Sequence, residues 1–123
     1  MIITDEVELW ALISTLLEFK FGENGCSATL AGSFPLGKVI DGLWEEFQTT
    51  RMFQTMLPVS VWNARLQLTP ERKEWSRIVG WITDTKAWNS WSNEQKQQFI
   101  RVLGLPCVIP PDHIDQLLNI QSN

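Results

Sequence analysis

The chain has 123 residues, of which 44% are hydrophobic and 11% aromatic, and its formal net charge is −4. This length suits one domain, because two separate cores would each be too small, and the apolar fraction excludes a disordered segment. The negative charge makes a phosphate-binding surface, and with it nucleic-acid binding, an unfavourable interpretation. No apolar run approaches the roughly 20 residues that cross a bilayer. The acidic N-terminus lacks the basic region of a secretory signal, so we expect a soluble, cytoplasmic protein without a membrane segment.

The first half of the chain predicts two long helices. Residues 5–21 have helical periodicity, with Thr4 or Asp5 as the N-cap and Gly22 as the stop. Apolar side chains cover about half of the circumference of this helix, a wider arc than a surface helix shows. We therefore expect it to lie at the centre of the fold, packed on two sides. A second, amphipathic helix begins at Pro35 and covers residues 35–48.

The middle of the chain supports more than one assignment. Residues 49–58 continue the second helix or form another short one that Pro58 ends. In residues 59–68 helical spacing competes with strand-like alternation, and we favour a helix. The alternative is a small two-stranded element made of residues 26–31 and 59–68. The run Thr69-Pro70-Glu71 then predicts a helix start, with an N-cap, a proline in the first turn and an acidic residue beside it.

Two further helices are predicted before the C-terminus. Ser92 and Gln95 have the spacing of a capping box, and Gly104 ends the helix that they begin. Pro111 begins a last short helix, and residues 119–123 are expected to form a frayed tail. No internal repeat or linker divides residues 1–123 into two domains. The predicted fold class is therefore all-α, a compact single-domain bundle of five to six helices.

One short motif resembles a nucleotide-binding loop. Residues 32–38, GSFPLGK, match the spacing G-x-x-x-x-G-K of a phosphate-binding loop. Val39 stands where that motif needs a hydroxyl for magnesium, and Pro35 removes one of the N–H donors. We interpret the segment as a turn into a helix and expect no nucleotide or other cofactor.

The cysteines and the single histidine are weak candidates for chemistry. Cys26 and Cys107 lie far apart and in no metal-ligand spacing, so we expect a reduced pair and no metal site. A nucleophilic pair of Cys107 and His113 would need the two side chains within hydrogen-bonding reach, which the spacing does not establish. A small enzyme that uses these two residues is the least favoured functional hypothesis.

The tryptophans carry the strongest functional signal. Trp10, Trp44 and Trp75 lie on apolar helix stripes, which predicts that they belong to the core. Trp81 falls about 60° outside its stripe by the helix period, and Trp88 and Trp91 lie in the polar segment AWNSWSN. Large aromatic side chains are enriched at the centres of protein interfaces. The alternative, equally favoured, is that these rings fold back over the core.

From these observations we expect a non-catalytic, acidic interaction protein, such as an adaptor, an inhibitor or an immunity-like factor. Its partner would be a protein, with a basic surface that complements the negative charge. A self-assembling structural subunit that uses the same apolar surplus is the alternative. The predicted binding residues are Trp81, Trp88 and Trp91, rimmed by Asp84, Lys86 and Glu94.

Overall fold

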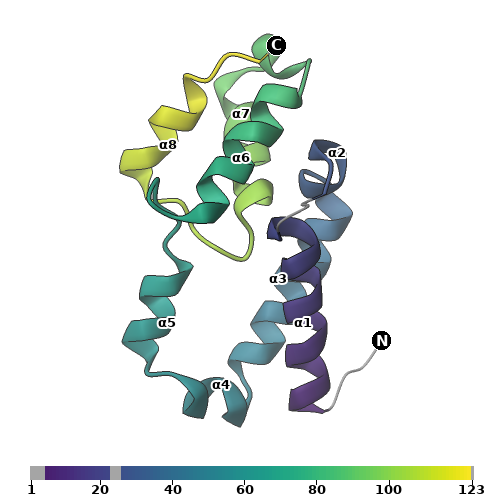
Figure 1. Cartoon of the computed structure of the whole chain (residues 1–123), viewed down its shortest axis with the longest axis vertical. Helices are drawn as coiled ribbons and strands as arrows, with labels where there is room; N and C mark the ends of the chain where they lie inside the picture. Colours follow the sequence, from purple (N-terminus) through teal and green to yellow (C-terminus); the bar gives the residue numbers. More distant parts are fainter. Residues whose placement is uncertain (1–4, 23–25, 123) are drawn as a thin grey trace.

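The computed structural model describes residues 5–22 and 26–122, and these residues form an all-α fold, as predicted. The described part contains eight α-helices and one short 3-10 helix, more than the predicted five to six because the chain breaks into extra short helices. None of these helices is both long enough and apolar enough to cross a membrane. The elements are α1 (Glu6–Phe21), α2 (Ala28–Ala31), α3 (Phe34–Gln48), α4 (Arg51–Met56), α5 (Val59–Leu66), α6 (Lys73–Asp84), the 3-10 helix η1 (Trp88–Ser90), α7 (Asn93–Gly104) and α8 (Pro111–Leu118) (Figure 1).

One cluster of buried side chains joins α1, α3 and α5, and we name it the aromatic cluster. Its buried members are Leu9, Ile13, Trp44, Phe47 and Trp62. The rings of Trp44 and Trp62 meet edge to face, with centroids 5.7 Å apart at 70°. Such edge-to-face pairs are favoured because the positive ring edge meets the negative ring face. This cluster holds together the part of the molecule that precedes residue 67.

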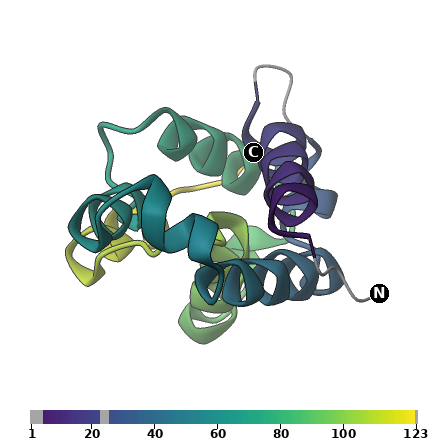
Figure 2. The ribbon, with the colours of Figure 1, turned by 90° about the horizontal axis from the view of Figure 1, so that it is seen from below.

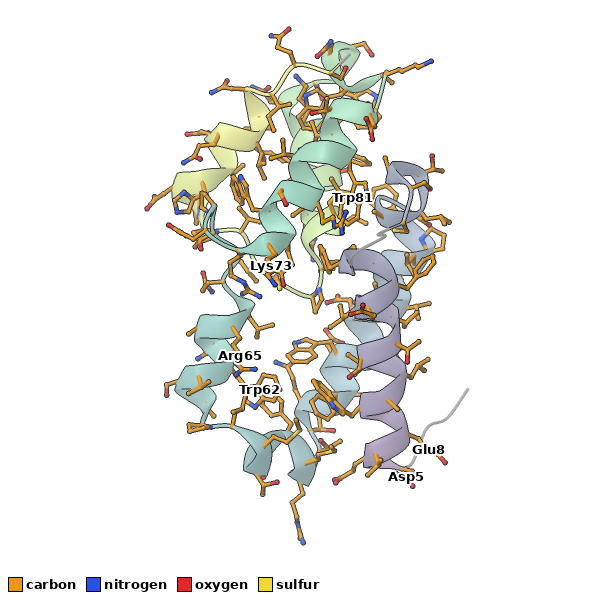
Figure 3. The ribbon with its side chains drawn as sticks, viewed as in Figure 1. Asp5, Glu8, Trp62, Arg65, Lys73 and Trp81 are labelled. Atoms are coloured by element: carbon orange, nitrogen blue, oxygen red, sulfur yellow. The ribbon has the colours of Figure 1, made fainter. Side chains whose placement is uncertain are left out.

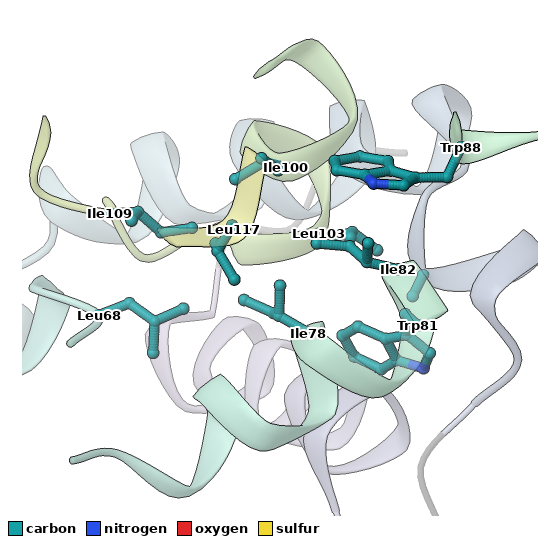
Figure 4. Close-up of a cluster of buried hydrophobic side chains, with 10 residues drawn as sticks. Leu68, Ile78, Trp81, Ile82, Trp88, Ile100, Leu103, Ile109 and Leu117 are labelled. Atoms are coloured by element: carbon teal, nitrogen blue, oxygen red, sulfur yellow. The ribbon is translucent and has the colours of Figure 1, made fainter. Parts of the chain in front are cut away.

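A second cluster lies among α6, η1, α7 and α8, with Ala31 of α2 at its border (Figure 4). Trp88 is its largest fully buried side chain. The indole Nε1 of Trp88 donates a hydrogen bond of 2.7 Å to the carbonyl oxygen of Ile120. The buried members are Ala31, Leu68, Ile78, Trp81, Ile82, Trp88, Ile100, Leu103, Ile109 and Leu117.

Helix α1 lies at the edge of the molecule, against α3 and α4 (Figures 1 and 2). Only Leu9, Ile13 and Lys20 of this helix are buried, whereas Val7 and Phe19 are exposed. The prediction of a central helix packed on two sides is therefore wrong. The apolar arc of α1 is wider than the surface that its neighbours offer to cover it.

Local signals placed several helix ends correctly. Oδ1 of Asp5 accepts hydrogen bonds from the backbone N–H groups of Val7 and Glu8, at 2.8 and 3.2 Å, so it is the N-cap of α1. The predicted capping box of Ser92 and Gln95 is present at the start of α7. Both devices satisfy N–H groups that a helix start leaves without partners.

Residues 59–66 form helix α5, as favoured, and the two-stranded alternative is wrong because residues 28–31 are helical too. Trp62 is the one buried residue of α5, and its Nε1 donates a 3.0 Å hydrogen bond to the carbonyl oxygen of Phe53. Extended pairing in the described residues is limited to a single parallel bridge between Gln67 and Val108. Helix α5 is therefore attached to the core mainly through one indole ring.

Two predicted boundaries differ from the structure. Helix α6 begins at Lys73 and not at Thr69, because residues 69–72 form a turn in which the N–H of Arg72 bonds the carbonyl oxygen of Thr69 at 3.0 Å. The expected frayed tail is ordered over residues 119–122. There the N–H of Ser122 donates to Oδ1 of Asn89 at 3.0 Å, beside the bond between Trp88 and Ile120.

The burial of Trp88 generates a stability prediction. Replacing Trp88 by alanine should lower the free energy of unfolding by about 3–5 kcal/mol, because a large ring leaves a cavity that the core fills only in part. Trp91→Ala, which removes a half-buried ring, should cost clearly less. Denaturant unfolding followed by far-ultraviolet circular dichroism measures both. Equal, small losses would contradict a core position for Trp88.

Candidate functional site

The predicted aromatic interface does not form a surface. Trp88 has 0% of its surface exposed and Trp81 5%, so neither ring can contact a partner in this conformation. Nε1 of Trp81 donates a 2.8 Å hydrogen bond to the carbonyl oxygen of Cys26, because the segment before α2 covers this side of α6. The prediction that these two rings are exposed is therefore wrong.

The remaining predicted binding residues lie around a filled core. Trp91 is half-buried, and its ring meets that of Phe99 edge to face, with centroids 5.1 Å apart. Asp84, Lys86 and Glu94 are exposed, as expected for a rim. Because Trp81 and Trp88 lie in the core, these exposed residues do not surround the large apolar centre that makes an interface strong.

An exposed apolar and acidic surface exists instead on α1, and we call it the outer face of α1. By the helix period it runs along the side opposite the buried residues Leu9 and Ile13. Val7 is 65% exposed and Phe19 49%. The outer face consists of Val7, Glu8, Ala11, Thr15, Glu18 and Phe19, all of them exposed.

The charges on this face are all negative. Among residues 5–22 and 26–122, the one ion pair joins Arg72 to Glu74, at 3.4 Å, so Glu8 and Glu18 have no cationic partner there. The single cation of α1 is Lys20, which points inward and is fully buried. The outer face therefore offers apolar contact beside uncompensated carboxylates.

The sequence contained a signal for this face. The wide apolar arc of residues 5–21 extends to Phe19, and Val7 and Ala11 add apolar side chains beyond it. A helix that is apolar on most of its sides is normally buried, and here the described residues of this chain do not supply the cover.

The buried amine of Lys20 fixes the orientation of α1. Its Nζ donates hydrogen bonds to the carbonyl oxygens of Val102 at 2.8 Å and Leu105 at 3.1 Å, at the end of α7. It also lies 5.1 Å from the ring centre of Phe21. Burial lowers the pKa of this amine to about 8, while the neighbouring thiols of Cys26 and Cys107 act in the opposite direction.

A cleft of about 310 Å³ lies between α1 and α5. The indoles of Trp10, Trp44 and Trp62 line it, together with Arg65 and Cys107. Burial raises the pKa of the Cys107 thiol, so the reactive thiolate is disfavoured at neutral pH. The cleft therefore has an apolar wall of indole rings beside the guanidinium group of Arg65.

The histidine considered with Cys107 is engaged elsewhere. Its ring lies edge to face with that of Trp75, with centroids 6.1 Å apart. The amide nitrogen of Gln116 lies 3.2 Å from Nδ1 of His113. His113 is therefore a side chain of α8 that packs against Trp75 and Gln116.

Comparison of the chain with protein-family models, curated proteins and solved structures finds no match in any of the three. The functional argument therefore rests on the surfaces described above.

The buried amine generates a pH prediction. In the unfolded chain Lys20 holds its proton up to about pH 10.5, whereas in the fold its pKa is about 8. Between these values the unfolded state binds more protons, so stability rises with pH. The wild type should therefore gain about 3 kcal/mol relative to Lys20→Met across this range, at about 1.4 kcal/mol per pKa unit.

Denaturant unfolding at a series of pH values measures this difference. The two thiols are present in both proteins and, because burial raises their pKa values, they lower stability with rising pH in both. Parallel stability curves for the two proteins would contradict the depressed pKa of Lys20.

Proposed function

We propose that this protein is a non-catalytic interaction protein that binds a partner protein through the outer face of α1. The observation that carries the proposal is an apolar, acidic helix at the edge of the fold, with Phe19 and Val7 exposed. Covering one such side chain contributes about 1.5–3 kcal/mol of favourable transfer free energy. A partner that covers several of them gains enough to bind, even after the cost of association.

The charge of the face supports a basic partner. Glu8 and Glu18 are exposed and unpaired by any cation of the described residues. A partner surface that brings Lys or Arg to these positions gains complementary pairing and faster association, whereas a surface of carboxylates is repelled. The proposal therefore keeps a protein partner with a basic surface and moves the binding site from the tryptophans to α1.

The test compares two phenylalanines that are both about half exposed. Phe19 lies on the outer face of α1, and Phe34, which is 57% exposed, lies at the start of α3 and borders α7. Phe19→Glu should reduce partner binding at least tenfold, because it places a charge where apolar contact is needed. Phe34→Glu adds the same charge elsewhere and should leave binding unchanged.

Affinity capture from host extract with the wild type and both variants, read by mass spectrometry, measures this effect. Thermal unfolding provides the folding control, since exposed substitutions change stability by only about 0.5 kcal/mol. The proposal is supported if a basic protein, or the chain itself, is retained by the wild type and Phe34→Glu and lost with Phe19→Glu. Equal capture by all three proteins would contradict it.

A further inference from the structure

The stretch that forms α4 and α5 carries positive charges and no negative ones. Between Glu46 and Glu71 the sequence contains no aspartate or glutamate, but it contains Arg51 and Arg65. Both arginines are exposed. This segment is therefore a positively charged part of a molecule whose net charge is −4.

Helix α5 carries an open hollow of about 590 Å³, which shares Arg65 and Arg72 with the cleft between α1 and α5. It is lined by Ser60, Val61, Ala64, Arg65 and Arg72. Three of these side chains are small or apolar and two are guanidinium groups, so the hollow can receive a helix and attract carboxylates. Its composition is the complement of the outer face of α1.

The two guanidinium groups differ in their engagement. Arg72 is held by Glu74 and by the carbonyl oxygens of Arg65 and Gln67. Arg65 is exposed and has no carboxylate partner within the described ranges. The hollow therefore contains one positioned cation and one that is available to a ligand.

We infer that the partner of α1 is a second copy of this chain, whose α5 hollow receives the outer face of α1. This inference rests on the function proposed above and names the partner. Helix α5 has eight residues and is about 12 Å long, so it covers about half of α1. A contact that runs from Ala11 to Phe19, also about 12 Å, places the ring of Phe19 against Val61 and Glu18 near the guanidinium groups.

The contact joins two different faces, one on α1 and one on α5. Figure 3 shows Glu8 on the side of α1 away from α5, and Arg65 on α5 across the cleft. Such a head-to-tail contact leaves one unused face of each kind at the ends of every open assembly, and none in a closed ring. The chain therefore forms rings or open chains of copies, which weaken as salt screens the charges.

A symmetric contact between two α1 helices is disfavoured by the same charges. In an antiparallel pair Glu8 of one copy would approach Glu18 of the other, and like charges at close range oppose binding. Charge complementarity thus favours the α5 hollow of a second copy as the surface that binds the outer face of α1.

Two variants and two matched controls test the inference. Ala11→Lys brings a cation to the outer face of α1, and Ala64→Glu brings an anion into the α5 hollow. Gln97→Lys on α7 and Asn63→Glu, one residue before Ala64, add the same charges at exposed positions outside the two faces. Thermal unfolding should be nearly equal for all four.

Sedimentation velocity over a series of concentrations gives the result. The wild type and both controls should form species larger than a monomer, and each face variant alone should remain monomeric. An equimolar mixture of Ala11→Lys and Ala64→Glu should form dimers that neither variant forms alone, because the mixture retains one intact α1 face and one intact hollow.

Three outcomes would overturn the inference. If Ala64→Glu assembles like the wild type while Ala11→Lys does not, α1 binds a second α1 and the proposed function survives with another geometry. If the wild type is monomeric at all concentrations but captures a basic host protein through Phe19, the partner is a different chain. If the wild type is monomeric and captures nothing, both the inference and the proposed function fail.

Discussion

The orientation of α1 depends on one buried amine. Lys20 extends from the last turn of α1 to the carbonyl oxygens of Val102 and Leu105 at the end of α7. The carbonyl oxygen of Val102 also accepts the N–H of Leu105, whereas the end of α7 supplies no helical partner for that of Leu105. Rotating α1 so that Phe19 entered the core would withdraw the amine and leave a buried polar group and the Leu105 carbonyl unsatisfied, at a cost of several kcal/mol. The hydrogen bonds of Lys20 thus keep the apolar and acidic side of α1 turned outward.

This orientation separates the charges of the molecule. With its only cation inside, α1 presents Glu8 and Glu18 to solvent, while the stretch without acidic residues runs through α4, which packs against α1, to α5 on the other side of the cleft. The aromatic cluster holds the two sides at a set spacing, since Trp62 of α5 packs against Trp10 of α1 at 6.1 Å. A molecule with unlike charged, apolar faces on two different helices is suited to assembly in a head-to-tail manner.

Features set by neighbours in the chain were predictable from the sequence, and features set by distant segments were not. The N-cap of Asp5 and the capping box of Ser92 and Gln95 involve residues within one turn, so spacing alone revealed them. The burial of Trp81 depends on residues around Cys26, 55 positions away, and Lys20 meets Val102 across 82 positions. The wide apolar arc of α1 was predicted from the sequence, but the central position inferred from it was wrong. Sequence spacing does not say whether this chain or another one covers such an arc.

The most direct test of the account measures the solvent exposure of Phe19 as the protein associates. Hydroxyl-radical footprinting with mass spectrometry reports the reactivity of individual side chains in dilute and in concentrated solution. We expect Phe19 on α1 and Val61 on α5 to become protected together at high concentration, whereas Phe34 and Val108, which are exposed outside both faces, keep their reactivity. Unchanged reactivity of Phe19 at every concentration, and after addition of host extract, would contradict the claim that the outer face of α1 is a binding surface.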